Sequence, residues 1–524
     1  MKAGSSAEES GPAAGRRWRL QAIAGVALIT TLGFAGLSIS NQVERADSDQ
    51  PRAVQATVTI SPKPAPTSVP RGFFGLSTEY WTLPLYARHL AVFERVLGLL
   101  HVRGSGPFVL RIGGDSADHT FWTTGARRLP AWALRLTPRW TNVARRLVRR
   151  LGLRLILDLN LITDTPASAA RWARAAARRL PRRSIAGFEV GNEPDIYSHT
   201  FWAAMTAGEM VGGQRLPLAV TPAAYAADFR AYASALAGAS PGVPLIGPAL
   251  ATPRTHWRWI SALLASRPPN LGTVSVHRYP YTACARHRRS PVFPTVARLL
   301  SPAASTGMAA SLAPALAAAH RAGLPLRLTE LNSVTCGGRR GVSNTFATAL
   351  WAPDALFALL RRGVAGVNLH LRANAINAPF AFARRGLSAR PLFYGLLMFT
   401  RTLGPRARLI AVGTHAPRAS HLVVWAVRTS GEWHVLLIDK GPRRVRVTVV
   451  LPTTGPAAVQ RMLARSPRAQ AGVTLGGRWL DRRGRWQGRA SHELVSRGRR
   501  GYVLTLPRYS AALVSARSLP SGPG

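Results

Sequence analysis

The sequence is poor in cysteine, lysine and acidic residues. Its 524 residues include 2 Cys and 22 Asp and Glu, and lysine occurs only at Lys2, Lys63 and Lys440. Two cysteines exclude a small disulfide-stapled scaffold, and a hydrophobic content of 47% excludes a chain that is disordered as a whole. Because acids are so scarce, a carboxylate at the end of a predicted strand stands out as a candidate functional residue.

Positive charge is in excess and comes almost entirely from arginine. The 69 Lys and Arg against 22 Asp and Glu give a net charge of +47, and 69 − 3 leaves 66 Arg. This preference for arginine over lysine is typical of codon usage in a GC-rich genome. The alternative is that the positive charge was selected for binding a polyanionic partner. Basic residues are spread along the whole chain rather than gathered in one segment, so we predict no nucleic-acid partner.

An uncharged run lies near the N-terminus, at residues 20–39, behind a basic region at residues 1–19. A run of this length spans the hydrocarbon of a bilayer, and the basic flank is expected on the cytoplasmic side. The pattern predicts contact with a membrane through residues 20–39, as an anchor or, alternatively, as a cleavable signal segment. The rest of the chain is therefore predicted to be extracytoplasmic, either membrane-anchored or secreted.

Composition divides the remaining chain into four parts. Residues 40–70 form a Pro-rich linker, inside which residues 54–60 alternate as a strand does. Residues 71–404 alternate apolar runs with amphipathic stretches, 405–517 contain strands without helices between them, and 518–524 form a tail. The apolar runs lie at 72–80, 108–114, 153–161, 185–193, 244–250, 273–280, 325–332 and 364–372. We therefore predict an α/β fold, a (β/α)₈ TIM barrel followed by a β-sandwich that the strand at 54–60 joins.

Polar residues close most of these runs, at the strand ends where such barrels place their active sites. Glu193 closes the fourth run and Glu330 lies in the seventh. Two such carboxyl groups can divide the acid and nucleophile roles of glycoside hydrolysis, whereas the alternative is a pair of solvated loop acids. The other strand-end candidates are Glu79, Arg111, Asp115, Asn160, Asn192, His277, Tyr279, Asn332, His370 and Arg372.

Five segments together resemble one family of enzymes. GNEPD at 191–195 and LTELNS at 328–333 resemble the acid/base and nucleophile motifs of clan A glycoside hydrolases. LRIGGDSAD at 110–118, VHRYP at 276–280 and ELNSVTCGG at 330–338 narrow the resemblance to family 79, the heparanases and β-glucuronidases. The resemblance extends from about residue 54 to residue 517.

This resemblance implies a retaining mechanism with Glu193 as acid/base and Glu330 as nucleophile. It further implies that Asn192 holds the sugar 2-hydroxyl and that Tyr279 hydrogen-bonds the nucleophile. Backbone amides at Gly337 and Gly338 would help to hold the carboxylate of a uronic acid.

Further site residues are predicted with their alternatives open. Glu79 is expected to bind sugar rather than be merely solvated, and His277 either contacts sugar or is satisfied by its protein neighbours. Arg111 and Asp115 either shape the site or form a structural ion pair.

Cys284 and Cys336 follow neighbouring strands, so in an exported protein we expect them to form a disulfide. The alternatives are two unrelated buried thiols, or a zinc site that includes His277 and His287. The spacing does not favour the zinc site, because no tight cysteine pair is present. We expect no metal and no cofactor.

Two classes of function follow from these observations. The first is a retaining β-glycosidase acting on a carbohydrate substrate, namely β-glucuronides or related uronic-acid glycosides, which makes an acidic glycan the expected partner. A retaining clan A enzyme with arabinofuranoside, xyloside or glucoside specificity is the variant within this class. The second class is a non-catalytic, polyanion-binding surface protein.

Overall fold

The computed structural model describes residues 53–61, 66–102, 104–123, 128–198, 220–417 and 420–518. The predictions for residues 1–19 and 20–39, and for the tail beyond Ser518, lie outside these ranges. Within them, no helix combines the length and the apolar character needed to cross a bilayer.

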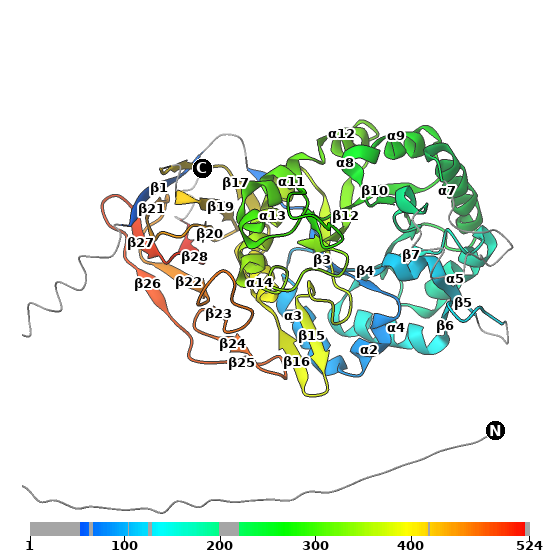
Figure 1. Cartoon of the computed structure of the whole chain (residues 1–524), viewed down its shortest axis with the longest axis horizontal. Coiled ribbons are helices and arrows are strands. Elements are labelled where there is room, and N and C mark those ends of the chain that lie inside the picture. Colours follow the sequence, from blue (N-terminus) through cyan, green and yellow to red (C-terminus); the bar gives the residue numbers. More distant parts are fainter. Residues whose placement is uncertain are drawn as a thin grey trace, which may run out of the picture. The chain divides into compact units, whose positions relative to one another are not determined.

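A closed barrel of eight parallel strands forms the first part of the fold (Figure 1). Most of these strands are buried along almost their full length, which is why their sequences are continuous apolar runs rather than alternating ones. In barrel order the strands are β3 (Phe74–Glu79), β4 (Val109–Gly113), β7 (Arg154–Leu159), β8 (Ile185–Val190), β9 (Leu245–Leu250), β10 (Leu271–Arg278), β12 (Leu326–Leu331) and β14 (Gly366–His370). Each predicted run contributes one strand, so the predicted TIM barrel is confirmed.

Helices cover the outside of the barrel, and several begin as their sequences predict. The side chains of Thr165 and Thr221 accept hydrogen bonds from the first turns of α5 (Pro166–Arg179) and α7 (Pro222–Ala237). Gly152 ends α4 (Pro138–Leu151) in the left-handed conformation that glycine adopts without strain. The other helices are α2 (Thr82–Ala87), α3 (Leu90–Leu100), α8 (Pro253–His256), α9 (Arg258–Ala265), α10 (Val296–Leu300), α11 (Thr306–Ala310), α12 (Ala313–Arg321), α13 (Phe346–Arg361) and α14 (Pro391–Leu403).

The second part is the predicted β-sandwich. Strand β1 (Val54–Ile60) lies in its smaller sheet, where it pairs in parallel with β21 (Val445–Val450) and antiparallel with β18 (Val412–His415). That sheet also contains β27 (Tyr502–Leu506). The larger sheet contains β2 (Thr67–Ser68), β17 (Arg408–Ile410), β19 (Leu422–Arg428), β20 (Glu432–Asp439), β28 (Ser510–Arg517), β22 (Ala457–Leu463) and β23 (Thr474–Leu475), with β26 (Glu493–Val495) paired to β22.

Among the described residues, four short strand pairs lie outside the barrel and the two sheets of the sandwich. They are β5 (Thr120–Trp122) with β6 (Leu134–Leu136), β11 (Tyr281–Thr282) with β13 (Val334–Thr335), β15 (Phe380–Ala383) with β16 (Gly386–Ala389), and β24 (Trp479–Leu480) with β25 (Trp486–Gln487).

A buried ion pair joins the barrel to the sandwich. Lys440, directly after β20, places its Nζ 2.5 Å from Oδ2 of Asp354 in α13. The indole Nε1 of Trp425 donates to the other carboxylate oxygen at 3.0 Å. Both carboxylate oxygens are therefore bonded, although the side chains of Asp354 and Lys440 are almost fully buried.

We expect Lys440→Met to lower the free energy of unfolding by about 3 to 5 kcal/mol, because it leaves the Asp354 carboxylate buried without its cation. The double variant Asp354→Leu/Lys440→Met should recover most of this loss. Urea unfolding measures both, with Arg146→Met as the control, since that guanidinium is exposed and lies 3.8 Å from Glu94. A loss no larger for Lys440→Met than for the control would contradict the assignment.

Candidate active site

A cavity of about 390 Å³ opens at the C-terminal ends of the barrel strands. Its walls contain most of the predicted strand-end residues, which belong to six of the eight strands or to the loops that follow them. The lining residues are Glu79, Asp115, Asn192, Glu193, Ile196, Tyr279, Cys284, Glu330, Thr335, Cys336, Gly337, His370, Arg372 and Asn377. The cavity therefore lies where the fold class predicts an active site.

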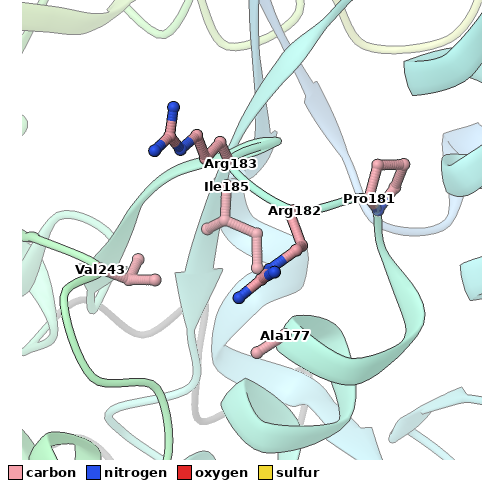
Figure 2. A pocket seen from close by; sticks show the side chains of 6 residues that line it. All are labelled: Ala177, Pro181, Arg182, Arg183, Ile185 and Val243. Carbon is pink, nitrogen blue, oxygen red and sulfur yellow. The ribbon is translucent and has the colours of Figure 1, made fainter.

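Another hollow, of about 500 Å³, lies near the opposite ends of the strands. It is lined by Ala177, Pro181, Arg182, Arg183, Ile185 and Val243, around the start of β8 (Figure 2). These residues offer two arginine side chains but no carboxylate or histidine. We therefore take the cavity at the C-terminal ends as the candidate active site.

Glu330 lies on β12 and is held by three side chains. Nη1 of Arg111 donates to Oε1 at 2.6 Å, and the phenol of Tyr279 donates to Oε2 at 2.7 Å. Nδ1 of His370 lies 3.2 Å from Oε1. The carboxylate is thus fixed on both oxygens and lines the cavity, as a nucleophile must.

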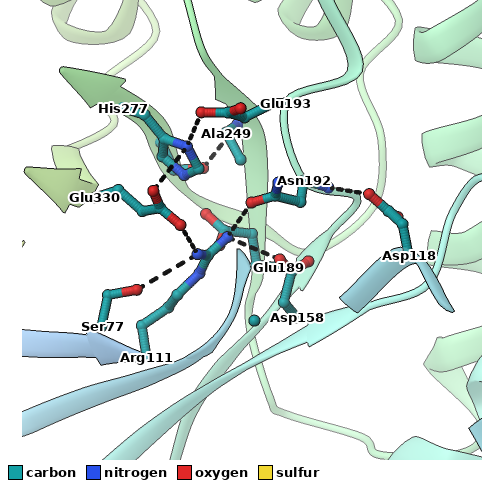
Figure 3. Close-up of polar contacts among 12 residues, drawn as sticks. Ser77, Arg111, Asp118, Asp158, Glu189, Asn192, Glu193, Ala249, His277 and Glu330 are labelled. Carbon is teal, nitrogen blue, oxygen red and sulfur yellow. Dashed lines mark hydrogen bonds and ion pairs between the residues drawn. The ribbon is translucent and has the colours of Figure 1, made fainter. Parts of the chain in front are cut away.

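Glu193 follows β8 in a left-handed backbone conformation, with φ of 54°. Its amide donates to the carbonyl of Ala249 at 3.1 Å, which holds the turn (Figure 3). Its Oε1 lies 2.8 Å from Nδ1 of His277. One oxygen of Glu193, one ring nitrogen of His277 and one oxygen of Glu330 lie within 4.8 Å of one another, a spacing that suits the closely set carboxyl pair of a retaining glycosidase.

The surroundings push the pKa values of the two carboxyl groups apart. Burial and the charge of Glu330 raise the pKa of Glu193 to about 7, against the opposing effect of His277. Burial also acts to raise the pKa of Glu330, but His370, His277, Arg111 and the Tyr279 hydroxyl outweigh it and lower the pKa to about 2. Burial lowers the pKa of His370 itself to about 4, so Arg111 supplies the permanent positive charge at neutral pH. One group is therefore poised as an acid and the other as an anion.

Arg111, on β4, is fully buried and hydrogen-bonds five side chains, of which the hydroxyl of Ser77, at 3.4 Å, is the most distant (Figure 3). Besides Glu330, it donates from Nε to Glu189 at 2.7 Å and from Nη2 to Asp158 at 2.7 Å. Nη2 also donates to Oδ1 of Asn192 at 2.9 Å. Asp115 is not among its bonded partners, so the alternative of an Arg111–Asp115 ion pair does not hold, and Arg111 instead pairs with Asp158, Glu189 and Glu330.

Asp118 holds the turn that carries Asn192 and Glu193. Its Oδ2 accepts from the backbone amide of Asn192 at 3.3 Å and from the hydroxyl of Tyr197 at 2.8 Å, and its Oδ1 accepts from the amide of Leu161. Burial raises the pKa of Asp118 to about 7. The side-chain amide of Asn192 is held separately by Arg111, so this residue is positioned on both sides.

Glu79 and Asp115 add two more carboxyl groups to the cavity wall. Oε2 of Glu79 accepts from the amide of Ser116 at 2.8 Å, and Oε1 lies 3.7 Å from Nε2 of His370. Burial and the nearby Asp115 raise the pKa of Glu79 to about 8, so a protonated Glu79 can donate a hydrogen bond to a sugar hydroxyl. Its place on the cavity wall agrees with the predicted sugar contact.

Two of the predicted sugar contacts need correction. The side chain of His277 is fully buried, with Nδ1 bonded to Glu193 and Nε2 without a hydrogen-bond partner among the described residues, so it contacts the acid/base candidate and does not line the cavity. The amide of Gly338 donates to the carbonyl of Thr335 at 3.3 Å, and a Cβ at this position would lie 2.7 Å from the side chain of Asn377. The amide of Gly338 is therefore engaged within its own loop and the residue packs closely against the connection after β14, whereas Gly337 lines the cavity.

The predicted disulfide between Cys284 and Cys336 is confirmed, and both cysteines line the cavity. It closes a loop of 52 residues, for which the chain-entropy relation gives a stabilisation of roughly 4 kcal/mol. The bond also removes both thiolates that the zinc alternative required. Among the described residues, the group that could hold a metal ion is Glu193, His277 and Glu330, whose atoms already bond to one another and to Arg111 and Tyr279.

Several residues of the site were not predicted from the sequence. Asp158 and Glu189 lie inside apolar strand runs, and in a chain with few acids that position signals a buried partner for a cation. No sequence signal predicts the role of Asp118, because its partners lie in loops that only the folded barrel brings close to it.

Comparisons with known proteins agree with this architecture. No protein-family model and no curated protein sequence matches the chain. A solved 4-O-α-L-rhamnosyl-β-D-glucuronidase from Fusarium oxysporum is similar in fold, with a TM-score of 0.69 at 18% identity over 88% of this chain and 100% of its own. A family 51 α-L-arabinofuranosidase from Bifidobacterium longum is similar with a TM-score of 0.63 at 16% identity, over 89% of this chain and 100% of its own. A family 30 xylanase from Talaromyces cellulolyticus matches with a TM-score of 0.53 at 11% identity, over 88% of this chain and 100% of its own. The fold is thus one that glycoside hydrolases of several specificities share.

Proposed function

We propose that this protein is a retaining β-glycosidase that hydrolyses β-glucuronides or related uronic-acid glycosides. The observation that carries the proposal is the pair Glu193 and Glu330, whose nearest side-chain atoms lie within 4.8 Å and whose pKa values are about 7 and about 2. A protonated Glu193 gives its proton to the leaving oxygen while the Glu330 carboxylate attacks the anomeric carbon. Glu193 then acts as the base that activates water, which releases the sugar from Glu330.

The neighbouring residues have separate tasks in this mechanism. Tyr279 and Arg111 orient the Glu330 carboxylate, and His277 orients Glu193. We expect Asn192, whose Oδ1 accepts from Arg111, to bond the sugar hydroxyl next to the reacting carbon. Between about pH 2 and about pH 7, Glu330 is therefore an anion while Glu193 is protonated.

The preference for a uronic acid rests on positive charge at the cavity wall. Arg372 and Gly337 line the cavity, and Cζ of Arg372 lies 5.9 Å from the ring centre of Trp81. Arg339, in the loop after the nucleophile, does not line the cavity, and its Cζ lies 4.4 Å from the ring centre of Phe293. A carboxylate loses water on entering the cavity, and a charge-assisted hydrogen bond from Arg372 offsets that cost.

We expect an aryl β-glucuronide to be cleaved about 10²-fold better in kcat/KM than the matching β-glucoside, since one charge-assisted bond contributes about 1.5 to 3 kcal/mol. Arg372→Gln should reduce this preference by about tenfold or more, whereas Arg340→Gln, in the loop after the nucleophile, should leave it unchanged. Equal rates on the two glycosides, or faster cleavage of an arabinofuranoside, would remove the uronide assignment while leaving a retaining glycosidase.

The pH profile is expected to follow the two carboxyl groups. Since Glu193 must be protonated to act as an acid, kcat/KM should fall above about pH 7, and the acid limb should lie near pH 2. His277 lowers the pKa of Glu193, so His277→Phe should move the alkaline limb to higher pH. His320→Ala, an exposed histidine on α12, is the control, and an alkaline limb that does not respond to His277→Phe would contradict the acid role of Glu193.

We also propose that the protein acts outside the cytoplasm, held at a membrane or secreted. The disulfide supports this location, because such bonds persist in oxidising compartments.

A further inference from the structure

An exposed tryptophan lies on the β24–β25 hairpin, in the C-terminal part of the chain. Among the described residues, Trp479 is the one aromatic side chain that is strongly exposed, at 46%. A hollow of about 470 Å³ lies beside it, with Leu480, Tyr394 and Thr474 among its walls. The exposed part of the indole is therefore open to a stacking contact with a ligand.

The indole of Trp479 is held in place by backbone. A Cβ added to Gly488 would lie 2.5 Å from Cζ3 of Trp479 and 2.8 Å from the carbonyl of Gly477, so the ring rests directly against the glycine. The amide of the next residue, Leu480, donates to the hydroxyl of Tyr394 at 3.1 Å. The exposed part of the ring is therefore a preformed flat surface, which loses little conformational entropy when a ligand stacks on it.

The hairpin that carries this ring is rich in arginine. Residues 478–489 contain five Arg and one Asp, so 5 − 1 gives a net charge of +4 in twelve residues. The exposed members are Arg482, Arg483, Arg485 and Arg489. Asp481 accepts the backbone amides of Arg483 and Arg485, so the one acid of the segment is engaged in holding the turn.

The hairpin is also fixed to the barrel. The carbonyl of Arg482 accepts from the amide of Leu387 in β16 at 2.8 Å. Strands β15 and β16 belong to the connection after β14, and the same connection supplies Asn377 to the wall of the active-site cavity. A ligand on the hairpin would therefore be held on a segment tied to the rim of that cavity.

We propose that the hairpin is a binding site for an acidic polysaccharide built of uronic acids. The apolar face of a pyranose ring stacks on Trp479, and the carboxylates along the chain pair with Arg482, Arg483 and Arg485. Carboxylates suit these side chains, because the planar guanidinium bonds a planar carboxylate through two parallel hydrogen bonds. The site is separate from Glu193 and Glu330, so it does not depend on the proposed catalytic function.

The test measures binding of the full chain to decameric oligogalacturonate, by calorimetry at about 0.15 M salt. This probe is α-linked, so the proposed β-glycosidase does not consume it. We expect Trp479→Ala to weaken binding by about fivefold and the triple variant Arg482→Ser/Arg483→Ser/Arg485→Ser to weaken it by about tenfold or more. The fully methyl-esterified decamer, which lacks the charge, should bind at least tenfold more weakly than the acid.

Two matched variants separate this site from the general charge of the protein. Arg171→Ser/Arg174→Ser/Arg178→Ser removes the same three charges from exposed positions on α5, and Leu494→Ala removes an apolar side chain that is 68% exposed. Each should change affinity by less than about twofold. Equal losses for the two arginine triples, no effect of Trp479→Ala with unchanged thermal unfolding, or equal binding of the methyl ester would each overturn the proposal.

Discussion

Replacing Glu330 by alanine is expected to lower kcat on an aryl β-glucuronide by at least about 10⁴-fold, because the carboxylate that attacks the anomeric carbon is lost. Its loss removes the group that Arg111 and Tyr279 orient toward the cavity. Steady-state kinetics on the purified variant measure the effect. Glu432→Ala, which removes a half-exposed carboxylate in the sandwich, is the control, and residual activity within tenfold of wild type would contradict the nucleophile assignment.

The partner variant Glu193→Ala should behave differently. Its activity should fall by about 10² to 10⁴-fold on substrates whose leaving group needs a proton, and by much less on an activated dinitrophenyl glycoside. Azide should restore turnover of the activated substrate, because a small anion fits the space left by the carboxylate and attacks the glycosyl intermediate. The same loss on both kinds of substrate, with no response to azide, would argue against the acid/base role.

The second large effect is expected at Arg111. Arg111→Lys keeps the positive charge, but one ammonium cannot reproduce the bonds that the guanidinium makes to Glu330, Glu189, Asp158 and Asn192. We expect kcat to fall by about 10²-fold and the free energy of unfolding to fall by about 3 kcal/mol. The acid limb of the pH profile should move upward, because Arg111 helps to lower the pKa of Glu330.

The shift of the acid limb distinguishes a positioning role from a purely structural one. Arg327→Lys is the matched control, since Arg327 lies on the same strand as Glu330 and donates to Asn368 at 2.6 Å. It should lower stability without moving the acid limb. If Arg111→Lys behaves in the same way, Arg111 serves the fold and not the nucleophile.

The barrel could be predicted from the sequence because its signals are local. Each strand is an apolar run, and each run is followed by an amphipathic stretch that covers it. Glu193 and Glu330 could be placed at one mouth because the parallel strands of a barrel end on the same side. The pairing of Cys284 with Cys336 followed from the same argument.

The partners of the buried polar side chains could not be predicted, because they depend on which side chains meet across the barrel. One of the two alternatives for Arg111 was an ion pair with Asp115, four residues on, yet the guanidinium reaches inward to Asp158, Glu189 and Glu330 on other strands. The strand direction alone does not tell which neighbour a long side chain meets. His277 shows the same limit, because its strand-end position suggested a sugar contact while its ring packs behind Glu193.

The central claim is that Glu330 forms a covalent bond to the sugar, and trapping that bond tests it most directly. A 2-deoxy-2-fluoro-β-glucuronyl fluoride slows the release of the intermediate, so incubation with the wild-type protein should leave one fluoroglucuronyl group on the chain. Peptide mass spectrometry is expected to place the group on Glu330, with no labelling of the Glu330→Ala variant. A label on Glu193 or another residue, or turnover of the reagent to an inverted product with no label at all, would contradict the account.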